Sequence, residues 1–155
     1  MTNLIQTITY IVQHSNELKN HFTSVSSAPI EFACIFCQTD EEYQNYTQEI
    51  KLLGKIVETT PTGYTYLLQK PISTVAGFLR LIKIRKPDPN RPERGDADFN
   101  TNYSEFKKRY KHISGFELVK RNSFEMLRLS SPDFDVMACF SNIPKSKSLG
   151  IKTAT

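Results

Sequence analysis

The order of predicted elements repeats within the chain, and this repeat limits the fold more than any other feature of the sequence. A buried run, a capped helix, a glycine, a hairpin and a further strand occur over residues 30–85 and again over residues 96–142. Each helix opens on a capping-box pattern, which begins at Thr39 in the first half and at Asn102 in the second. The two halves share few identical residues, so the alternative is that two amphipathic segments resemble each other by chance. The shared order predicts two copies of a β-α-β-β-β unit.

The remaining segments set the boundaries of the domain. Residues 3–22 are predicted to form an amphipathic helix, because apolar residues from Leu4 to Phe22 fall near one face. Residues 86–95 contain three prolines and a glycine, which indicate an extended connector without a helix. Residues 143–155 are predicted to be a loose tail. With 155 residues, the chain suits one domain of the α+β class.

Composition and charge weigh against several functions. Charged residues make up 23% and hydrophobic residues 39% of the chain, which is an ordinary globular mixture. The net charge of +4 is small for a nucleic-acid-binding protein, and the basic residues are scattered along the chain. The densest basic run, Lys107 to Lys111, is interpreted as a solvated helix face. Nucleic-acid association through that run is kept as an alternative.

Cysteine use and hydropathy predict a cytoplasmic protein with no membrane partner. Three cysteines, an odd and small number, indicate reduced thiols. Cys34 and Cys37 have C-x-x-C spacing, but residues three apart on a strand point to opposite faces, so they neither bridge nor share a metal. No apolar run approaches the ~18 residues of a membrane helix, and the N-terminus lacks the pattern of a secretory signal.

Three stretches, taken with the order of elements, resemble a known superfamily. Residues 62–78 are TGYTYLLQKPISTVAGF, residues 84–89 are IRKPDP, and residues 93–99 are ERGDADF. They are similar to the vicinal oxygen chelate superfamily of glyoxalase- and dioxygenase-like proteins, and within it to the YecM-like group, which also has a helix before the first unit. The resemblance implies a curved mixed sheet around a cleft. It also implies a homodimer, because relatives of this fold pair their subunits.

The resemblance further implies where a metal would lie. Members with a metal place His on the first strand of each unit and Glu on the last strand, and the divalent ion polarises substrate oxygens. At the positions that can be matched, this chain has Phe32, Arg85 and Asp98. An aromatic ring and a guanidinium do not ligate cations, and Asp98 alone is too few ligands. We therefore expect no metal and no cofactor, and an ion pair between Arg85 and Asp98 instead. The alternative is that these two residues are unrelated surface charges beside the connector.

The same cleft is the predicted site for a small anionic ligand, whose carboxylate or phosphate Arg85 would hold. The alternative is that these side chains pack the cleft solid as core. We interpret the chain as a non-catalytic or small-molecule-binding protein with the family metal site lost. The alternatives are a metal-dependent lyase, isomerase or dioxygenase of the same fold and a nucleic-acid-associated protein. The candidate ligand-binding residues are Phe32, Cys34, Tyr66, Arg85, Asp98 and Cys139.

Overall fold

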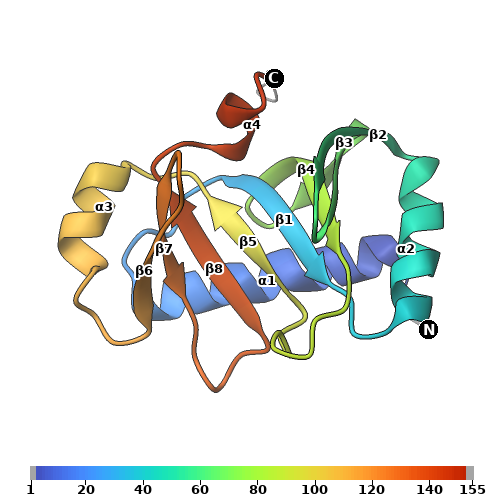
Figure 1. The fold of residues 1–155 in the computed structure, drawn as a ribbon. Helices are drawn as coiled ribbons and strands as arrows, with labels where there is room; N and C mark the ends of the chain where they lie inside the picture. The colour runs from blue at the N-terminus through green and yellow to red at the C-terminus, as the bar shows by residue number, and fades with distance from the viewer. Residues whose placement is uncertain (1–2, 153–155) are drawn as a thin grey trace.

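Two β-α-β-β-β units share one eight-stranded sheet (Figure 1). The computed structural model describes residues 3–152. The first unit consists of β1 (Ile30–Phe36), α2 (Asp40–Lys51), β2 (Gly54–Thr60), β3 (Gly63–Thr74) and β4 (Gly77–Arg85). The second consists of β5 (Gly95–Phe99), α3 (Tyr103–Tyr110), β6 (Phe116–Lys120), β7 (Glu125–Leu129) and β8 (Val136–Ser141). Helices α1 (Leu4–Phe22) and α4 (Lys145–Ser148) lie outside the units.

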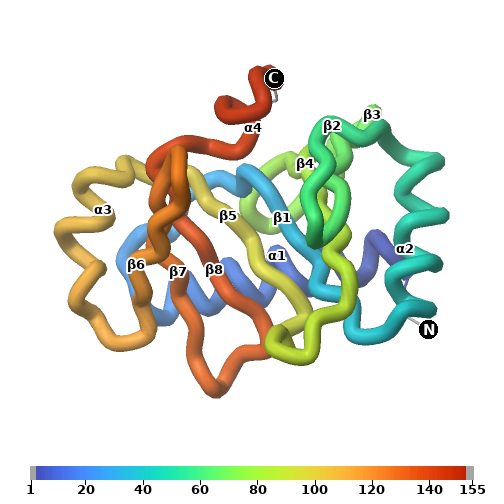
Figure 2. Tube along the Cα trace, in the orientation of Figure 1, coloured from blue at the N-terminus to red at the C-terminus, as the bar shows by residue number. Residues whose placement is uncertain are grey.

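The strand order is β2-β3-β4-β1-β5-β8-β7-β6, so the two units meet at the centre of the sheet. Strand β1 runs antiparallel to β5 along this seam, while β4 is parallel to β1 and β8 is parallel to β5. Outward from the seam, each unit has the same order of first, fourth, third and second strand. The predicted fold class is therefore confirmed: an α+β protein with two tandem units in one curved mixed sheet and an extra N-terminal helix (Figure 2).

Helix α1 covers one face of the sheet across the seam. Asn3 caps the helix, because its side chain accepts a hydrogen bond from Gln6 N and the Gln6 side chain accepts one from Asn3 N. The helix contacts β1, β5 and β8. Its fully buried apolar residues are Leu4, Ile8, Ile11, Val12 and Leu18. Helix α1 therefore fills this face of the central strands with apolar core.

The strand alternation separates the cysteines as expected. Cys37 belongs to the main core, whereas Cys34 belongs to a small cluster with Phe36 and Met137. All three cysteines of the chain are free and buried. No helix within residues 3–152 is both long enough and apolar enough to cross a membrane.

The prediction of a loose tail over residues 143–155 is wrong for the part that the structure describes. Residues 145–148 form α4, and the backbone N–H of Ser146 donates to Glu31 Oε2 at 2.7 Å. Glu31 lies on β1, so this bond ties the end of the chain to the central strands. Residues 153–155 lie outside the described residues.

Candidate functional site

A pocket of about 180 Å³ lies on the face of the sheet opposite α1. Alternate residues of β1, β4, β5 and β8 project into it, because successive side chains of a strand point to opposite faces. The segment after β8 also contributes to its walls. The lining residues are Phe32, Cys34, Phe36, Lys83, Arg85, Asp96, Asp98, Phe124, Met126, Cys139, Ser141, Ile143, Lys145 and Ser148.

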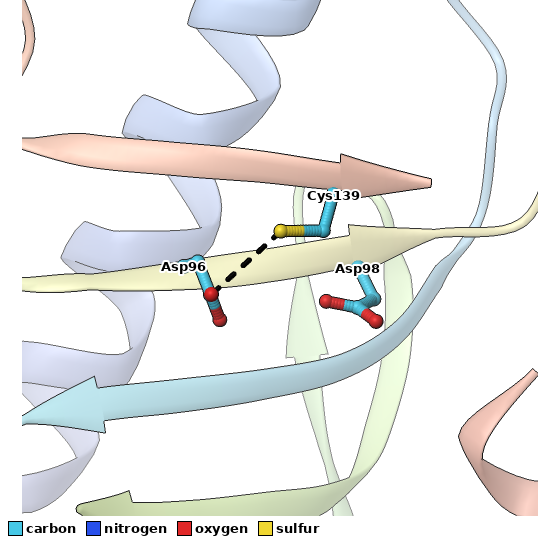
Figure 3. Close-up of side chains that lie close together, drawn as sticks. All are labelled: Asp96, Asp98 and Cys139. Atoms are coloured by element: carbon cyan, nitrogen blue, oxygen red, sulfur yellow. Dashed lines mark hydrogen bonds between the residues drawn. The ribbon is translucent and has the colours of Figure 1, made fainter. Parts of the chain in front are cut away.

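Two carboxyl groups and a thiol converge in the pocket (Figure 3). One ligand atom from each of Asp96, Asp98 and Cys139 lies within 4.8 Å of the others. Cys139 Sγ donates to Asp96 Oδ2 at 3.7 Å, and Ser141 Oγ donates to Asp98 Oδ2 at 3.4 Å. Within residues 3–152, neither carboxylate is in a salt bridge. The two acids therefore share a partly buried site without a neutralising cation in contact.

This environment makes both carboxyl groups weak acids. Burial raises the pKa of Asp96 to about 6, against the opposing effects of Cys139 and the nearby Arg128. Burial also raises the pKa of Asp98 well above its ordinary value, and the charge of Asp96 adds to that shift. Two like charges this close disfavour joint ionisation. A proton therefore binds more readily to either carboxyl group than to a free aspartate.

Strand β4 lines the other side of the pocket with cations. Lys83 Nζ donates to Thr62 Oγ1 at 2.7 Å, and burial lowers the pKa of Lys83. The Arg85 guanidinium lies 5.3 Å from the centre of the Phe36 ring. Arg85 Nε is buried and has no hydrogen-bond partner in residues 3–152.

The predicted ion pair between Arg85 and Asp98 is wrong. Arg85 Nη2 lies instead 3.1 Å from Asp88 Oδ2, in a salt bridge within the connector. Asp98 accepts from Ser141. The physical reason is topological: β1 lies between β4 and β5, so the two side chains stand on strands that are not neighbours.

The C-terminal segment contributes Ile143, Lys145 and Ser148 to the pocket lining, and its helix α4 lies at the top of the view in Figure 1. Lys145 Nζ lies 2.7 Å from Glu58 Oε1 on β2 and 5.4 Å from the centre of the Phe32 ring. Although burial opposes ionisation of Glu58, hydrogen bonds from Lys145 and Thr65 lower its pKa. The segment is therefore held over the pocket by charge and by the Ser146–Glu31 bond.

Five of the six predicted site residues line this pocket, namely Phe32, Cys34, Arg85, Asp98 and Cys139. Their role in binding stays a prediction. Tyr66 was placed on the wrong face. It is 1% exposed and belongs to the core under the helices, and it pairs with Ile82. Its neighbour Thr65 pairs with Lys83 and so has the cleft-facing position.

Sequence reasoning missed several polar residues of the pocket. Asp96 is two residues before Asp98 and so shares its face of β5. The same spacing relates Lys83 to Arg85. Alternation along the two strands was the signal that could have found both. Lys145 gave no such signal, because it follows the last strand.

The donor set fits a divalent ion poorly. Among the described residues, no histidine lines the pocket. Burial raises the pKa of the Cys139 thiol well above its ordinary value, so the thiolate that a metal requires is disfavoured. Three cationic side chains, Lys83, Arg85 and Lys145, line the same space. These residues do not fit a divalent ion, and loss of the family metal site stays a prediction.

Comparisons with known proteins identify the fold. No family model matches the chain, and no curated protein matches it. The solved structure of the structural genomics protein EC4020 is similar with a TM-score of 0.71 and 9% identity, over 92% of this chain and 87% of that chain. At this identity, the likeness shows a shared fold and no activity.

A second solved structure has a lower similarity. A glyoxalase/bleomycin resistance protein/dioxygenase superfamily member from Vibrio splendidus 12B01 has a TM-score of 0.43 and 9% identity, over 71% of this chain and 94% of that chain. This value is too low to carry an argument. The fold rests on the strand order and on the EC4020 likeness.

Proposed function

We propose that this chain is a small-molecule-binding protein of the vicinal oxygen chelate superfamily, close to the YecM-like group, with the family metal site lost. One observation carries the proposal: a pocket of about 180 Å³ brings two carboxyl groups and three cationic side chains together between aromatic rings. A concave site with apolar walls and a few convergent polar groups is the usual form of a small-molecule site. The tandem-unit fold supports the superfamily assignment.

The state of the thiols favours binding over nucleophilic catalysis. Burial raises the pKa of Cys34 and of Cys139 well above the ordinary value, and the charge of Asp96 adds to both shifts. The thiolate is the nucleophilic form of cysteine, so both side chains are poor nucleophiles at neutral pH.

Filling the pocket is expected to abolish binding. Ser141 lines the pocket and is half-buried, so Ser141→Tyr places a ring in the cavity. We expect fragments from a panel of small amines, acids and neutral polar molecules to shift the amide NMR signals of Cys34, Asp98 and Cys139 in the wild type. In Ser141→Tyr, affinity should fall at least tenfold. Ser123→Tyr, on an exposed turn, is the matched control. Shifts that map elsewhere, or that persist in Ser141→Tyr, would refute the proposal.

A metal-dependent enzyme is the second candidate, favoured by the convergence of Asp96, Asp98 and Cys139 within 4.8 Å. We expect purified protein to contain far less than one metal ion per chain, because the cations of the pocket oppose binding. Elemental analysis for Zn, Ni, Fe and Mn checks this. Stoichiometric metal that is lost in Asp98→Asn and retained in Asp133→Asn would establish the metal-dependent alternative.

A cytoplasmic location and a homodimer belong to the same proposal. Three free, buried thiols support a reducing compartment. The proposal of a homodimer is based on the superfamily resemblance. Sedimentation of the purified protein would measure its oligomeric state. The nucleic-acid alternative is weakened by Lys107, whose Nζ lies 2.6 Å from Glu125 Oε2, since this pair neutralises part of the basic run.

A further inference from the structure

The pocket has two walls of opposite charge. Lys83 and Arg85 project from β4, and Asp96 and Asp98 project from β5. Strand β1 lies between them, and Cys34 pairs with Lys83 on one side and with Asp96 on the other. The floor between the walls is therefore a thiol flanked by phenyl rings.

The walls do not neutralise each other by direct contact. Neighbouring strands are ~4.8 Å apart, so β4 and β5 stand roughly 10 Å apart across β1. The acidic wall has a thiol and a hydroxyl as its hydrogen-bond partners, both at long distance. It lacks a salt-bridge partner within residues 3–152. Carboxyl groups in a low-dielectric site are stabilised by a cation that enters with good geometry.

The basic wall, in turn, has donors without an anionic partner within residues 3–152. The Lys83 ammonium donates to a neutral hydroxyl, that of Thr62. Arg85 uses Nη2 toward Asp88, while its Nε is buried without a partner in the described chain. An anionic oxygen in the pocket would give Lys83 and the Arg85 guanidinium a charged acceptor, and guanidinium binds carboxylate and phosphate through paired donors.

We propose, building on the small-molecule-binding function, that the ligand is a small zwitterion. Its amino group binds between Asp96 and Asp98, and its carboxylate or other anionic group binds at Lys83 and Arg85. The anion site that the sequence predicted at Arg85 thus becomes one half of a two-ended site.

The size of the pocket sets the size of the ligand. A cavity of about 150 Å³ holds a benzene ring, so a pocket of about 180 Å³ suits roughly six to ten non-hydrogen atoms. Free amino acids and short amino carboxylates have this size. The apolar floor of Cys34 and Phe36 would contact the carbon chain between the two charged ends.

A ligand series on the wild-type protein is the decisive test. The probes are straight-chain amino acids from glycine to 6-aminohexanoate, with n-butylamine and butyrate as one-ended controls, titrated by NMR and calorimetry. We expect one chain length to bind at least tenfold more tightly than either control, because the two ends act together. Equal or tighter binding of butylamine or butyrate would overturn the zwitterion inference.

Two variants assign the ends. Asp98→Asn should weaken binding of the best amino acid and leave butyrate unchanged, whereas Arg85→Met should weaken the amino acid and leave butylamine unchanged. Asp133→Asn and Arg121→Met, at exposed positions, are the matched controls. If each variant lost binding of both n-butylamine and butyrate, the assignment of the two ends would be contradicted.

The outcomes separate the two proposals. If neutral or one-ended fragments bind in the pocket and amino acids bind no more tightly than they do, the zwitterion inference fails while small-molecule binding stands. If no probe of any class shifts the pocket signals, both fail.

Discussion

Gly95→Ala is expected to lower the free energy of unfolding by about 3 kcal/mol, at the upper end for overpacking of a core. A Cβ at this position would lie 2.2 Å from the Cys34 carbonyl oxygen and 2.7 Å from Ile11 Cδ1. The first contact is with backbone at the seam, where β5 pairs with β1, so it cannot be relieved by turning a side chain. The second contact is with α1. Even the smallest side chain must therefore push the two units or the helix apart.

Urea and thermal unfolding measure this effect. A loss of this size lowers the melting temperature of a domain this long by roughly 10 °C. Gly150→Ala is the control, because its φ of 68° strains alanine although a Cβ there meets nothing within 4 Å. It should cost about 1 kcal/mol, the ordinary cost of a left-handed conformation. Equal losses in the two variants would show that the close approach at the seam is unimportant.

Asp96→Asn is expected to stabilise the fold at pH 7 by about 1–3 kcal/mol, since one pKa unit corresponds to about 1.4 kcal/mol. Burial raises the pKa of Asp96 to about 6 in the folded state, whereas an unfolded aspartate titrates near 3.9. Between these values, the folded state binds more protons than the unfolded state. The stability of the wild type therefore falls as pH rises from about 4 to about 6 and stays lower above that range.

The asparagine variant lacks this titration, so its advantage should appear across the same window and vanish near pH 4. Unfolding by urea at pH 4, 5, 6 and 7 measures the difference. Asp133→Asn, on an exposed turn, is the control and should show no such window. If Asp96→Asn were less stable than the wild type at pH 7, burial of the Asp96 carboxylate would not be destabilising, contrary to its raised pKa. Stability gained together with lost binding would fit a functional site, where activity commonly costs stability.

The fold could be predicted because its signals are local and occur twice. The capping boxes at Thr39 and Asn102 mark both helices, and each N-cap side chain accepts the expected hydrogen bond. Glycines begin β2, β3, β4 and β5, although Pro71 lies inside β3. The order of these elements predicted the two units, and the superfamily resemblance implied the curved mixed sheet that they form.

The site could be predicted only in part, because the face that each strand turns to the pocket is set by pairing. On β3, Thr65 and Tyr66 are both buried, so hydropathy does not reveal which one faces the cleft. The pairing of β3 with β4 also shifts between Leu67 and Ile72. On β5, Asp96 and Asp98 alternate with small or apolar residues, and this pattern could have placed both acids. The closing contact of Lys145 with Glu58 joins residues far apart in sequence and had no local signal.

Helix α1 also determines when the core can close during synthesis. Ser15 Oγ donates to Met137 O, and Tyr10 Oη donates to Asp135, so these contacts span 122 and 125 residues of sequence. The helix is synthesised well before β8, and its other partner strands, β1 and β5, lie between the two in sequence. An isolated helix of this length is marginal in water, and contacts so distant in sequence slow folding. The part of the apolar stripe of α1 that packs on β8 therefore stays exposed to water until β8 has been synthesised.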